Sequence, residues 1–298
     1  MSFPSAPTPA FKQQFHDAFI EALAQKESRL QSTVIDRGQI GGSSFTINSL
    51  GTTEMEAVTN RYEDKKASEL DSGTRVVYMS DFDKLLAVDG FDIPKLAADP
   101  SYKYADLLVQ AANRRKDKTI YRALLDSVVT KTSETAFSTS ALGSSNIILS
   151  GATGFTKAKV IFARSQFRAN ECDNENGEEL FMLYDDNVVR AIMADTTLTS
   201  ADYMAVQMLQ TGQIARNWMG FTWIPYQSLD AGAGGSTEAR TVAYAKSAVH
   251  FGTGIDTKTE VGENKQKRGH PTEAYAWMSI GAGRQDEKKV MAIDFVKA

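Results

Sequence analysis

Histidine, cysteine and paired carboxylates build most catalytic and metal sites, so they are the first residues to test for chemistry. The chain has three histidines, His16, His250 and His270, and one cysteine, Cys172. None of the histidines lies in an HExxH pair or has a cysteine or carboxylate at the spacing of metal ligands. His16 follows Phe15 in an apolar helical pattern, which favours a packing or surface role. A single cysteine excludes an intrachain disulfide and fits a reducing cytosol.

Glycine-rich segments that could bind phosphate are also incomplete. GATGFTK at 151–157 has the wrong spacing for a phosphate loop, and no strong apolar strand leads into it. GTG at 252–254 lacks the third glycine of a dinucleotide fingerprint. The sequence therefore predicts no cofactor and no catalytic residue. This lowers the expectation of an enzyme without removing it, because a site can be assembled from distant residues.

The charged clusters have structural interpretations. CDNENGEE at 172–179 offers the oxygens that calcium prefers, but in a calcium-loop register from Glu171 its glycine falls at the seventh position instead of the sixth. We interpret it as a polar turn before a strand. The basic clusters at 114–116 and 265–268 have no interleaved aromatic residues to stack on bases, so ion pairs or solvated faces are the favoured interpretation.

Composition sets the class of protein. The chain has 298 residues, a net charge of −4 and 42% hydrophobic residues, which favours a folded protein with a sizeable core. No apolar run approaches the roughly 20 residues that span a bilayer, and the first residues do not form a signal peptide, so no membrane partner is expected. The acidic balance is a poor basis for gripping phosphate backbones.

The first 31 residues predict an arm followed by a helix. Three prolines lie within residues 1–9. Phe11, Phe15 and Phe19 then follow at every fourth position, which predicts an amphipathic helix to about Arg29. This apolar stripe must be buried somewhere. The chain's own core and a neighbouring subunit are both open as its partner.

Residues 32–80 are expected to be β-rich. Strand-like runs at 45–47 and 75–79 flank a highly charged segment at 54–69 that has almost no large apolar residues. Such a segment is poor core material and predicts a projecting hairpin or loop. It is either a mobile surface loop or an arm that holds a neighbour.

The strongest single element is a long helix that begins at Asp99-Pro100, an N-cap followed by a proline at the first helical position. Neither glycine nor proline interrupts residues 101–127, and about 27 residues give roughly 40 Å of helix. Its apolar stripe is broken by the charged residues 113–118. We expect a sheet along one face, and solvent or partners at the charged middle.

A Ser/Thr/Gly-rich stretch at 132–154 is the best candidate for a domain boundary. Alternating elements then predict a compact α/β unit at 155–229, and 231–237 reads as a flexible loop. The expected helices are at 156–168, 186–193 and 200–209, and the expected strands at 179–184, 218–224, 241–245, 274–280 and 290–296.

Three segments, taken in order, carry a resemblance to a known family. Residues 93–125, IPKLAADPSYKYADLLVQAANRRKDKTIYRALL, resemble the spine-helix region of the major capsid (coat) proteins of tailed double-stranded DNA bacteriophages. Residues 197–229 resemble the axial domain of that family, and 276–295 look like its terminal strand pair. The resemblance covers nearly the whole chain and rests on order and local pattern.

The resemblance implies an α+β capsid fold with a division by role. Its parts would be an N-terminal arm and helix (1–31), an extended β-hairpin loop (32–80), a peripheral domain (81–154) with the spine helix at 100–127, an axial domain (155–229), and a return to the peripheral strands (230–298). The implied function is a structural, self-assembling major capsid protein. Copies would form pentamers and hexamers of an icosahedral virion shell, assembled in the host bacterial cytoplasm.

The same resemblance suggests contacts and partners. The residues expected between subunits are Phe11, Phe15, Phe19, Arg61, Asp64, Lys65, Lys66, Arg114, Arg115 and Lys116. A separate scaffolding protein is expected, since no long charged helical extension precedes the arm. A portal protein and a possible decoration protein complete the partners, and the DNA is enclosed without sequence-specific binding. For a covalent cross-link from Lys65 or Lys66, the sequence shows no matching acid and acceptor.

Two alternatives stay open. An encapsulin-like compartment shell shares the fold but carries enzyme cargo. A soluble enzyme that uses the α/β unit at 155–229 is the alternative from another class.

Overall fold

The computed structural model describes residues 25–51, 53–55, 57, 72–88, 101–133, 135–194, 214 and 216–297. The chain forms two compact units. Unit 1 comprises Met1–Glu27, Asp81–Arg114 and Ile255–Ser279, and unit 2 comprises Ser28–Ser80, Arg115–Gly254 and Ile280–Ala298. The predicted helix over 200–209, the start at Asp99-Pro100 and most of the 54–69 segment lie outside the described residues.

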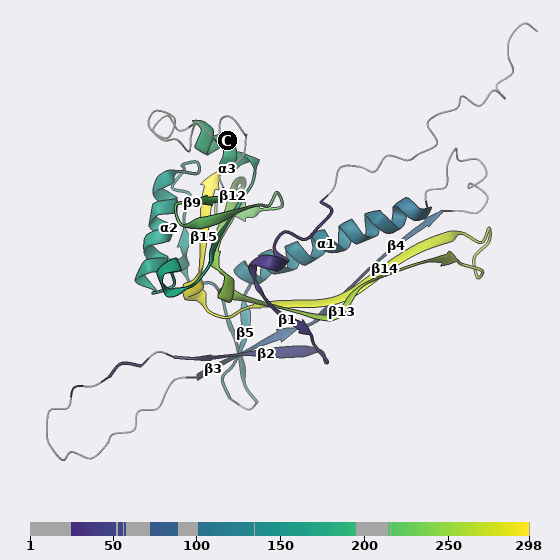
Figure 1. The fold of residues 1–298 in the computed structure, drawn as a ribbon, viewed down its shortest axis with the longest axis horizontal. Coiled ribbons are helices and arrows are strands. Elements are labelled where there is room, and N and C mark those ends of the chain that lie inside the picture. Colours follow the sequence, from purple (N-terminus) through teal and green to yellow (C-terminus); the bar gives the residue numbers. More distant parts are fainter. Residues whose placement is uncertain are drawn as a thin grey trace, which may run out of the picture. The chain divides into compact units, whose positions relative to one another are not determined.

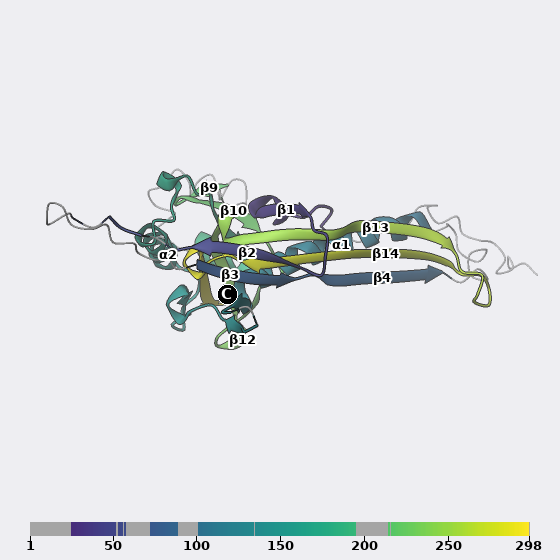
Figure 2. The same ribbon diagram turned by 90° about the horizontal axis from the view of Figure 1, so that it is seen from below.

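Unit 1 is built from a helix on a sheet. Residues 101–114 of the long helix α1 (Ser101–Leu125) lie in this unit. Residues 255–263 of β13 (Val249–Glu263) and residues 272–279 of β14 (Thr272–Arg284) lie in it too. In unit 1 these strands form a sheet with β4 (Ser80–Val88). The first residues of β13, which belong to unit 2, pair with β1 (Ile35–Gln39) of the same unit, so the strand order is β1-β13-β14-β4. Leu108 of α1 is buried against Ala274 and Ala276 of β14, where small side chains let the helix approach. The helix predicted for 100–127 and the sheet along one of its faces are both confirmed, and Figures 1 and 2 show α1 beside β4 and β14.

Unit 2 contains a mixed sheet in the order β7-β15-β12-β8-β10-β9, with β11 paired to β12. The helices α2 (Lys157–Ala169) and α3 (Asp186–Ala194) pack on it, as Figure 1 shows. The strands are β7 (Ile147–Ile148), β8 (Leu180–Tyr184), β9 (Asn217–Trp218), β10 (Phe221–Pro225), β11 (Asp230–Gly232), β12 (Gly235–Ala245) and β15 (Val290–Val296). Aromatic rings fill the core, with Phe155 edge-on to both Trp223 and Phe295.

Sequence periodicity explains the helices of unit 2. Val160, Ala163 and Phe167 recur at helical spacing and are buried on one side of α2. Before α3, the Asp185 side chain accepts a hydrogen bond from the Val188 backbone N–H at 3.0 Å, which caps the helix. The predicted helices at 156–168 and 186–193 and the strand at 179–184 are confirmed.

A second sheet of unit 2 is antiparallel, in the order β2-β3-β5-β6. Its strands are β2 (Ser44–Leu50), β3 (Ser72–Tyr78), β5 (Val128–Lys131) and β6 (Phe137–Ser140). The strands expected at 45–47 and 75–79 are therefore confirmed, and they pair as a hairpin. Short 3-10 helices complete the described elements: η1 (Gln31–Thr33), η3 (Ser144–Asn146), η4 (Asn174–Asn176), η5 (Lys246–Ala248) and η6 (Glu287–Lys289).

Two expected elements are wrong in detail. The single strand predicted for 218–224 is a hairpin, because Met219 and Gly220 adopt φ angles of 52° and 78° and reverse the chain between β9 and β10. The flexible loop predicted for 231–237 is also a hairpin, between β11 and β12. There the Gly234 N–H donates to the Glu238 carboxylate at 2.7 Å, and a Cβ at Gly234 would overlap that carboxylate.

The sequence analysis also missed β13 and extended the N-terminal helix too far. Most residues of β13 from Ile255 to Glu263 are exposed, so this half of the strand lacks the alternation of apolar and polar residues that marks a half-buried strand. The helix predicted to run to about Arg29 does not do so, because residues 25–30 are not helical. The division of the chain by role into arm, loop, peripheral and axial parts stays a prediction.

The chain's one cysteine offers a test of the core of unit 2. Cys172 is 5% exposed, and burial raises the pKa of its thiol to about 11. Because the thiolate is the reactive form, we expect an aromatic disulfide reagent at pH 8 to modify native protein at least about a hundredfold more slowly than protein in denaturant. Ser165→Cys on the exposed side of α2 is the positive control and should react at once. Fast reaction of native Cys172 would contradict the packing described for this region.

Candidate assembly surfaces and the polar joint behind them

The end of α1 is bound by a buried arginine. Arg284, at the end of β14, has no exposed surface, and its Nη1 donates to the carbonyl oxygens of Leu124 at 2.8 Å and Asp126 at 3.0 Å. The last carbonyls of a helix have no partner within the helix and carry the negative end of its dipole. A guanidinium at this place satisfies both needs.

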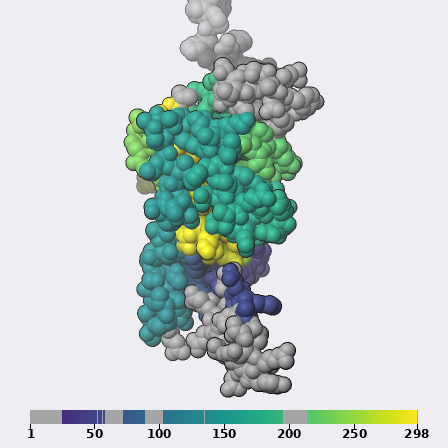
Figure 3. Space-filling view, turned by 90° about the vertical axis from the view of Figure 1, so that its left-hand side faces the viewer, coloured from purple at the N-terminus to yellow at the C-terminus, as the bar shows by residue number. Residues whose placement is uncertain are grey.

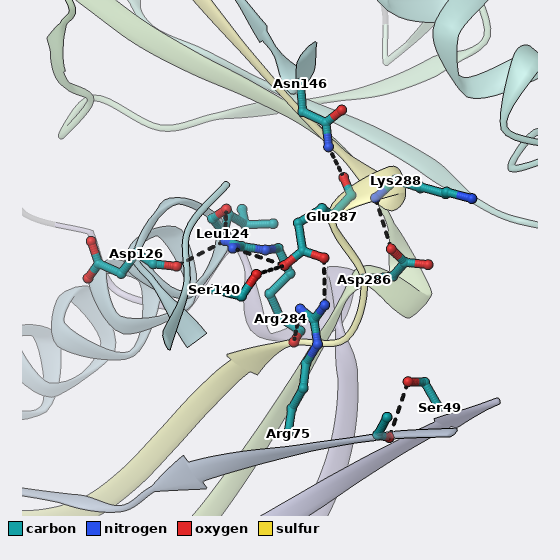
Figure 4. Close-up of polar contacts among 11 residues, drawn as sticks. Ser49, Arg75, Leu124, Asp126, Ser140, Asn146, Arg284, Asp286, Glu287 and Lys288 are labelled. Atoms are coloured by element: carbon teal, nitrogen blue, oxygen red, sulfur yellow. Dashed lines mark hydrogen bonds and ion pairs between the residues drawn. The ribbon is translucent and has the colours of Figure 1, made fainter. Parts of the chain in front are cut away.

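Glu287 connects this arginine to a second one. Its carboxylate lies 3.5 Å from Arg284 Nη2 and accepts a hydrogen bond from Arg75 Nη2 at 2.5 Å. Arg75 also donates to the Arg284 carbonyl oxygen at 3.3 Å, and Ser140 donates to the carboxylate. Figure 4 shows these contacts converging between β3, β6, β14 and the end of α1. We call Arg75, Arg284 and Glu287 the polar joint.

Glu287 offsets the repulsion between the two arginines of the polar joint. Burial and, to a lesser extent, the charge of Arg75 lower the pKa of Arg284, and the charge of Glu287 opposes both. Burial by itself would raise the pKa of Glu287, but the hydrogen bond and charge of Arg75 outweigh it and hold this pKa below its usual value. Glu287 therefore stays ionised at neutral pH. Its backbone is also bound, because Asn146 Nδ2 donates to the Glu287 carbonyl oxygen.

Small residues let the strands approach the joint. A Cβ at Gly283 of β14 would overlap the Val77 side chain of β3, and a Cβ at Gly281 would lie 2.9 Å from the Tyr78 carbonyl oxygen. Glycine inside a strand often marks such a close approach of two chain segments. The sequence shows this signal as GAGR at 281–284, directly before Glu287.

Breaking the polar joint should destabilise unit 2. Arg284→Met leaves the Leu124 and Asp126 carbonyl groups without their donor and removes one partner of Glu287. We expect the free energy of unfolding of unassembled subunits to fall by about 3 kcal/mol in urea titrations. Arg190→Met is the control, because Arg190 is 63% exposed and pairs with Asp186 on the surface of α3. Its effect should stay below about 1 kcal/mol, and equal effects of the two variants would contradict the role of the joint.

A buried carboxylate in the middle of α1 holds the chain that precedes η1. Asp117 is 1% exposed, and its Oδ1 accepts hydrogen bonds from Ser28 Oγ at 2.6 Å and from the Leu30 N–H at 3.1 Å. The Arg29 N–H also donates to this carboxylate at 3.1 Å. These bonds use backbone donors that a helix continuing through Arg29 would need, which explains why the predicted helix does not reach it.

Removing this carboxylate should release residues 28–30 from α1. In Asp117→Ala the part-buried Arg29 amide and the buried Leu30 amide lose their acceptor, so we expect a loss of about 1–3 kcal/mol in the free energy of unfolding. Tryptic cleavage after Arg29 should also become faster in limited proteolysis. Asp126→Ala removes an exposed carboxylate just after α1 and is the control. Unchanged cleavage in Asp117→Ala would show that the contact does not hold the segment.

The structure divides the charged stretch of α1. The side chains of Arg114 and Arg115 are exposed, but Lys116 is only 8% exposed and lies largely within the protein. The other residues expected between subunits, Phe11, Phe15, Phe19, Arg61, Asp64, Lys65 and Lys66, lie outside the described residues. Asp117 was missed by sequence reasoning, although an acid within a run of bases was its signal.

Exposed apolar side chains are the other surface feature that sequence reasoning missed. Ile161 and Phe162 are about half exposed on the outer side of α2, which forms part of the surface seen in Figure 3. Leu50, Tyr78 and Phe137 are exposed on the antiparallel sheet of unit 2. Exposed apolar groups of this size mark contact surfaces when they gather on one face.

Two kinds of feature are absent from the part of the chain that the structure describes. The described residues contain no group of histidine, cysteine or carboxylate side chains that could hold a metal ion. Within the same part of the chain, no helix has the length and apolar composition that a membrane crossing requires. An open hollow of about 690 Å³ beside η1 and β8 is lined by residues such as Glu178, Arg216 and Asn217, and its lining contains neither histidine nor cysteine.

The chain is similar to known proteins in sequence pattern and in fold. A family model described as phage capsid protein matches residues 8–297. The cyanophage Pam1 capsid asymmetric unit is 14% identical with a TM-score of 0.74 and coverage of 100% of both chains. The capsid of Ralstonia phage GP4 is 12% identical with a TM-score of 0.70, covering 100% of this chain and 99% of that one. A chain of Mycobacterium phage Che8 is 14% identical with a TM-score of 0.67, covering 97% and 98%. No curated protein matches the chain.

Proposed function

From the premise that the chain belongs to the phage capsid protein family, we propose that its copies, as pentamers and hexamers, build the icosahedral shell that encloses the double-stranded DNA of a tailed phage. The protein is structural, a major capsid protein. The observation that carries the proposal is the family match over residues 8–297, together with the likeness in fold to solved phage capsids over nearly the whole chain.

The geometry supports such a role because buried polar and apolar clusters lie behind exposed surfaces. The polar joint and the core of unit 2 are buried, while exposed arginines on α1 and exposed apolar groups on α2 face outward from the folded chain. A closed shell repeats the same contacts many times, so modest contacts suffice. The net charge of −4 is compatible with a container whose wall must not bind DNA tightly.

The finer parts of the proposal follow from the family resemblance. The segment 54–69 would extend over a neighbouring subunit, the N-terminal arm would do the same on the inner side, and residues 155–229 would gather around the symmetry axes. A scaffolding protein, a portal protein and a decoration protein are the proposed partners. Assembly in the host bacterial cytoplasm is proposed on the same ground.

Three measurements separate this function from its alternatives. We expect negative-stain images of the expressed protein, alone or with a candidate scaffold, to contain closed shells. Particles purified from infected cells should contain DNA, and mass spectrometry should find portal and tail proteins in them. A single co-purified enzyme would indicate an encapsulin-like compartment instead. A monomer or dimer at every concentration in light scattering, with no large assemblies, would favour the soluble enzyme.

The exposed arginines of α1 give a test of assembly at the level of residues. We expect Arg115→Glu to reduce the yield of shells at least tenfold, because it reverses a charge that we place at a subunit contact. The circular dichroism spectrum should not change, and the free energy of unfolding of unassembled subunits should change by less than about 1 kcal/mol, because interactions of an exposed side chain are weak.

Arg115→Lys is the matched control for this variant, because it keeps the charge and should keep most of the yield. Normal shells from Arg115→Glu would refute the contact at this residue but not the capsid function.

A further inference from the structure

The strand register of the β2-β3-β5-β6 sheet assigns its side chains to two faces. Residues directly opposite one another in an antiparallel pair point to the same side, and alternate residues along a strand share that side. Phe45 pairs with Val77 and Ile47 with Arg75, so these residues belong to one face. That face is turned inward, because Ile47 and Val77 are buried and Arg75 belongs to the polar joint.

The other face, which we call the outer sheet face, collects the exposed apolar groups of the sheet. Tyr78 is 56% exposed, Leu50 is 75% exposed and Phe137 is 55% exposed. The register places all three on this side, since 74, 76 and 78 alternate along β3, 46, 48 and 50 along β2, and Lys131 pairs with Phe137. The other members of the face are Ser44, Thr46, Asn48, Ser72, Thr74, Val76, Val129, Lys131 and Thr139.

The composition of this face narrows its partner. Lys131 is its only charged member, and threonine, valine and aromatic residues make up most of the rest. A face with one positive charge offers little to the phosphate groups of DNA, which are recognised by many bases. It also lacks the charge that would steer a strongly charged partner. The surface that fits it is another neutral, partly apolar protein surface.

The apolar area of the face can be compared with the area that a free dimer needs. Large aromatic side chains have roughly 150–250 Å² of surface each. Tyr78 and Phe137, which are more than half exposed, and the smaller Leu50 therefore contribute roughly 300 Å² together. A stable pair of proteins usually buries about 800 Å² on each partner. The three exposed apolar side chains are therefore too small to hold two copies together alone, but they suit one of several contacts that a shell repeats.

The edge of the sheet points the same way. Within the described residues β6 lies at the end of the strand order and pairs on one side with β5. Proteins normally cover or charge such an edge to prevent uncontrolled pairing, but the sequence of β6, FSTS, has no charge. A partner seated beside it would cover both the edge and the apolar groups.

We infer that the outer sheet face is a contact surface for a second copy of this chain within the assembled shell. The inference rests on the proposed self-assembly and adds to it a surface with named residues. Its largest exposed aromatic groups are Tyr78, at the end of β3, and Phe137, on the edge strand β6. Val76, Val129 and Thr139 form a neutral row across the sheet between these two positions.

A pair of variants on one strand tests the inference. Phe137→Glu places a charge on the outer sheet face, and Ser138→Glu places the same charge one residue away on the opposite face, where Ser138 is also exposed. We expect Phe137→Glu to lower the yield of shells at least tenfold and Ser138→Glu to lower it less than twofold. Normal shells from Phe137→Glu, or equal losses from both variants, would overturn the inference.

Hydroxyl-radical footprinting of the unmutated protein tests the same surface without requiring that any variant folds. We expect oxidation of Tyr78 and Phe137 to be at least threefold slower in shells assembled from the purified chain than in unassembled subunits. Unprotected Tyr78 and Phe137 in such shells, or protection only after another protein is added, would overturn the second copy as partner. Failure of the unmutated chain to form any shell would instead count against the proposed function.

Discussion

A buried guanidinium at the carboxyl end of α1 is the constraint on which unit 2 depends. Arg284 cannot lie there without a counter-charge and acceptors, because an unpaired buried charge costs several kcal/mol. Arg284 Nη1 donates to the Leu124 and Asp126 carbonyl oxygens, and Glu287 supplies the counter-charge and in turn binds Arg75. Arg284 Nε and Nη2 have no hydrogen-bond partner among the described residues. The two arginines and Glu287 therefore connect the end of the long helix, the β3 strand and the turn that leads into β15. A buried ion network of this kind specifies an arrangement more than it adds stability.

The buried interior has a different character from the exposed surfaces. Around the joint, glycine residues at 281 and 283 bring strands into close contact, and the aromatic side chains of unit 2 are buried in its core. Outward, the exposed groups are modest: half-exposed Ile161 and Phe162 on α2, and a small neutral face on the antiparallel sheet. A subunit that must join many neighbours reversibly during assembly benefits from this separation, since no single contact is strong enough to trap a wrong arrangement.

The sequence predicted elements wherever a local pattern records burial. The α1 helix, α2, α3 and β8 were predicted because their apolar residues keep a helical period or a continuous run. The second half of β13 was not predicted because most of its residues are exposed. The two hairpins were not predicted because the glycine turn of each was interpreted as a loop or as part of a strand. The polar joint could not be predicted, since Arg284 and Leu124 lie 160 residues apart and nothing local pairs them. Of the contacts expected from the resemblance, Arg114 and Arg115 are exposed, and the burial of Lys116 is set by a tertiary packing that helical spacing does not reveal.

The short turn between β5 and β6 has a consequence for how this chain can vary. Its backbone is fixed by hydrogen bonds from the Thr132 and Ser133 N–H groups to the Ala136 carbonyl oxygen. Because side chains alternate along a strand, inserting or deleting one residue here would rotate every side chain of β6 to the opposite side of the sheet. Phe137 would then turn toward the interior and Ser138 and Ser140 would turn outward, without any change in composition. Length in this turn is thus a constraint as strict as the identity of the aromatic residue that follows it, and substitutions are tolerated there more easily than insertions.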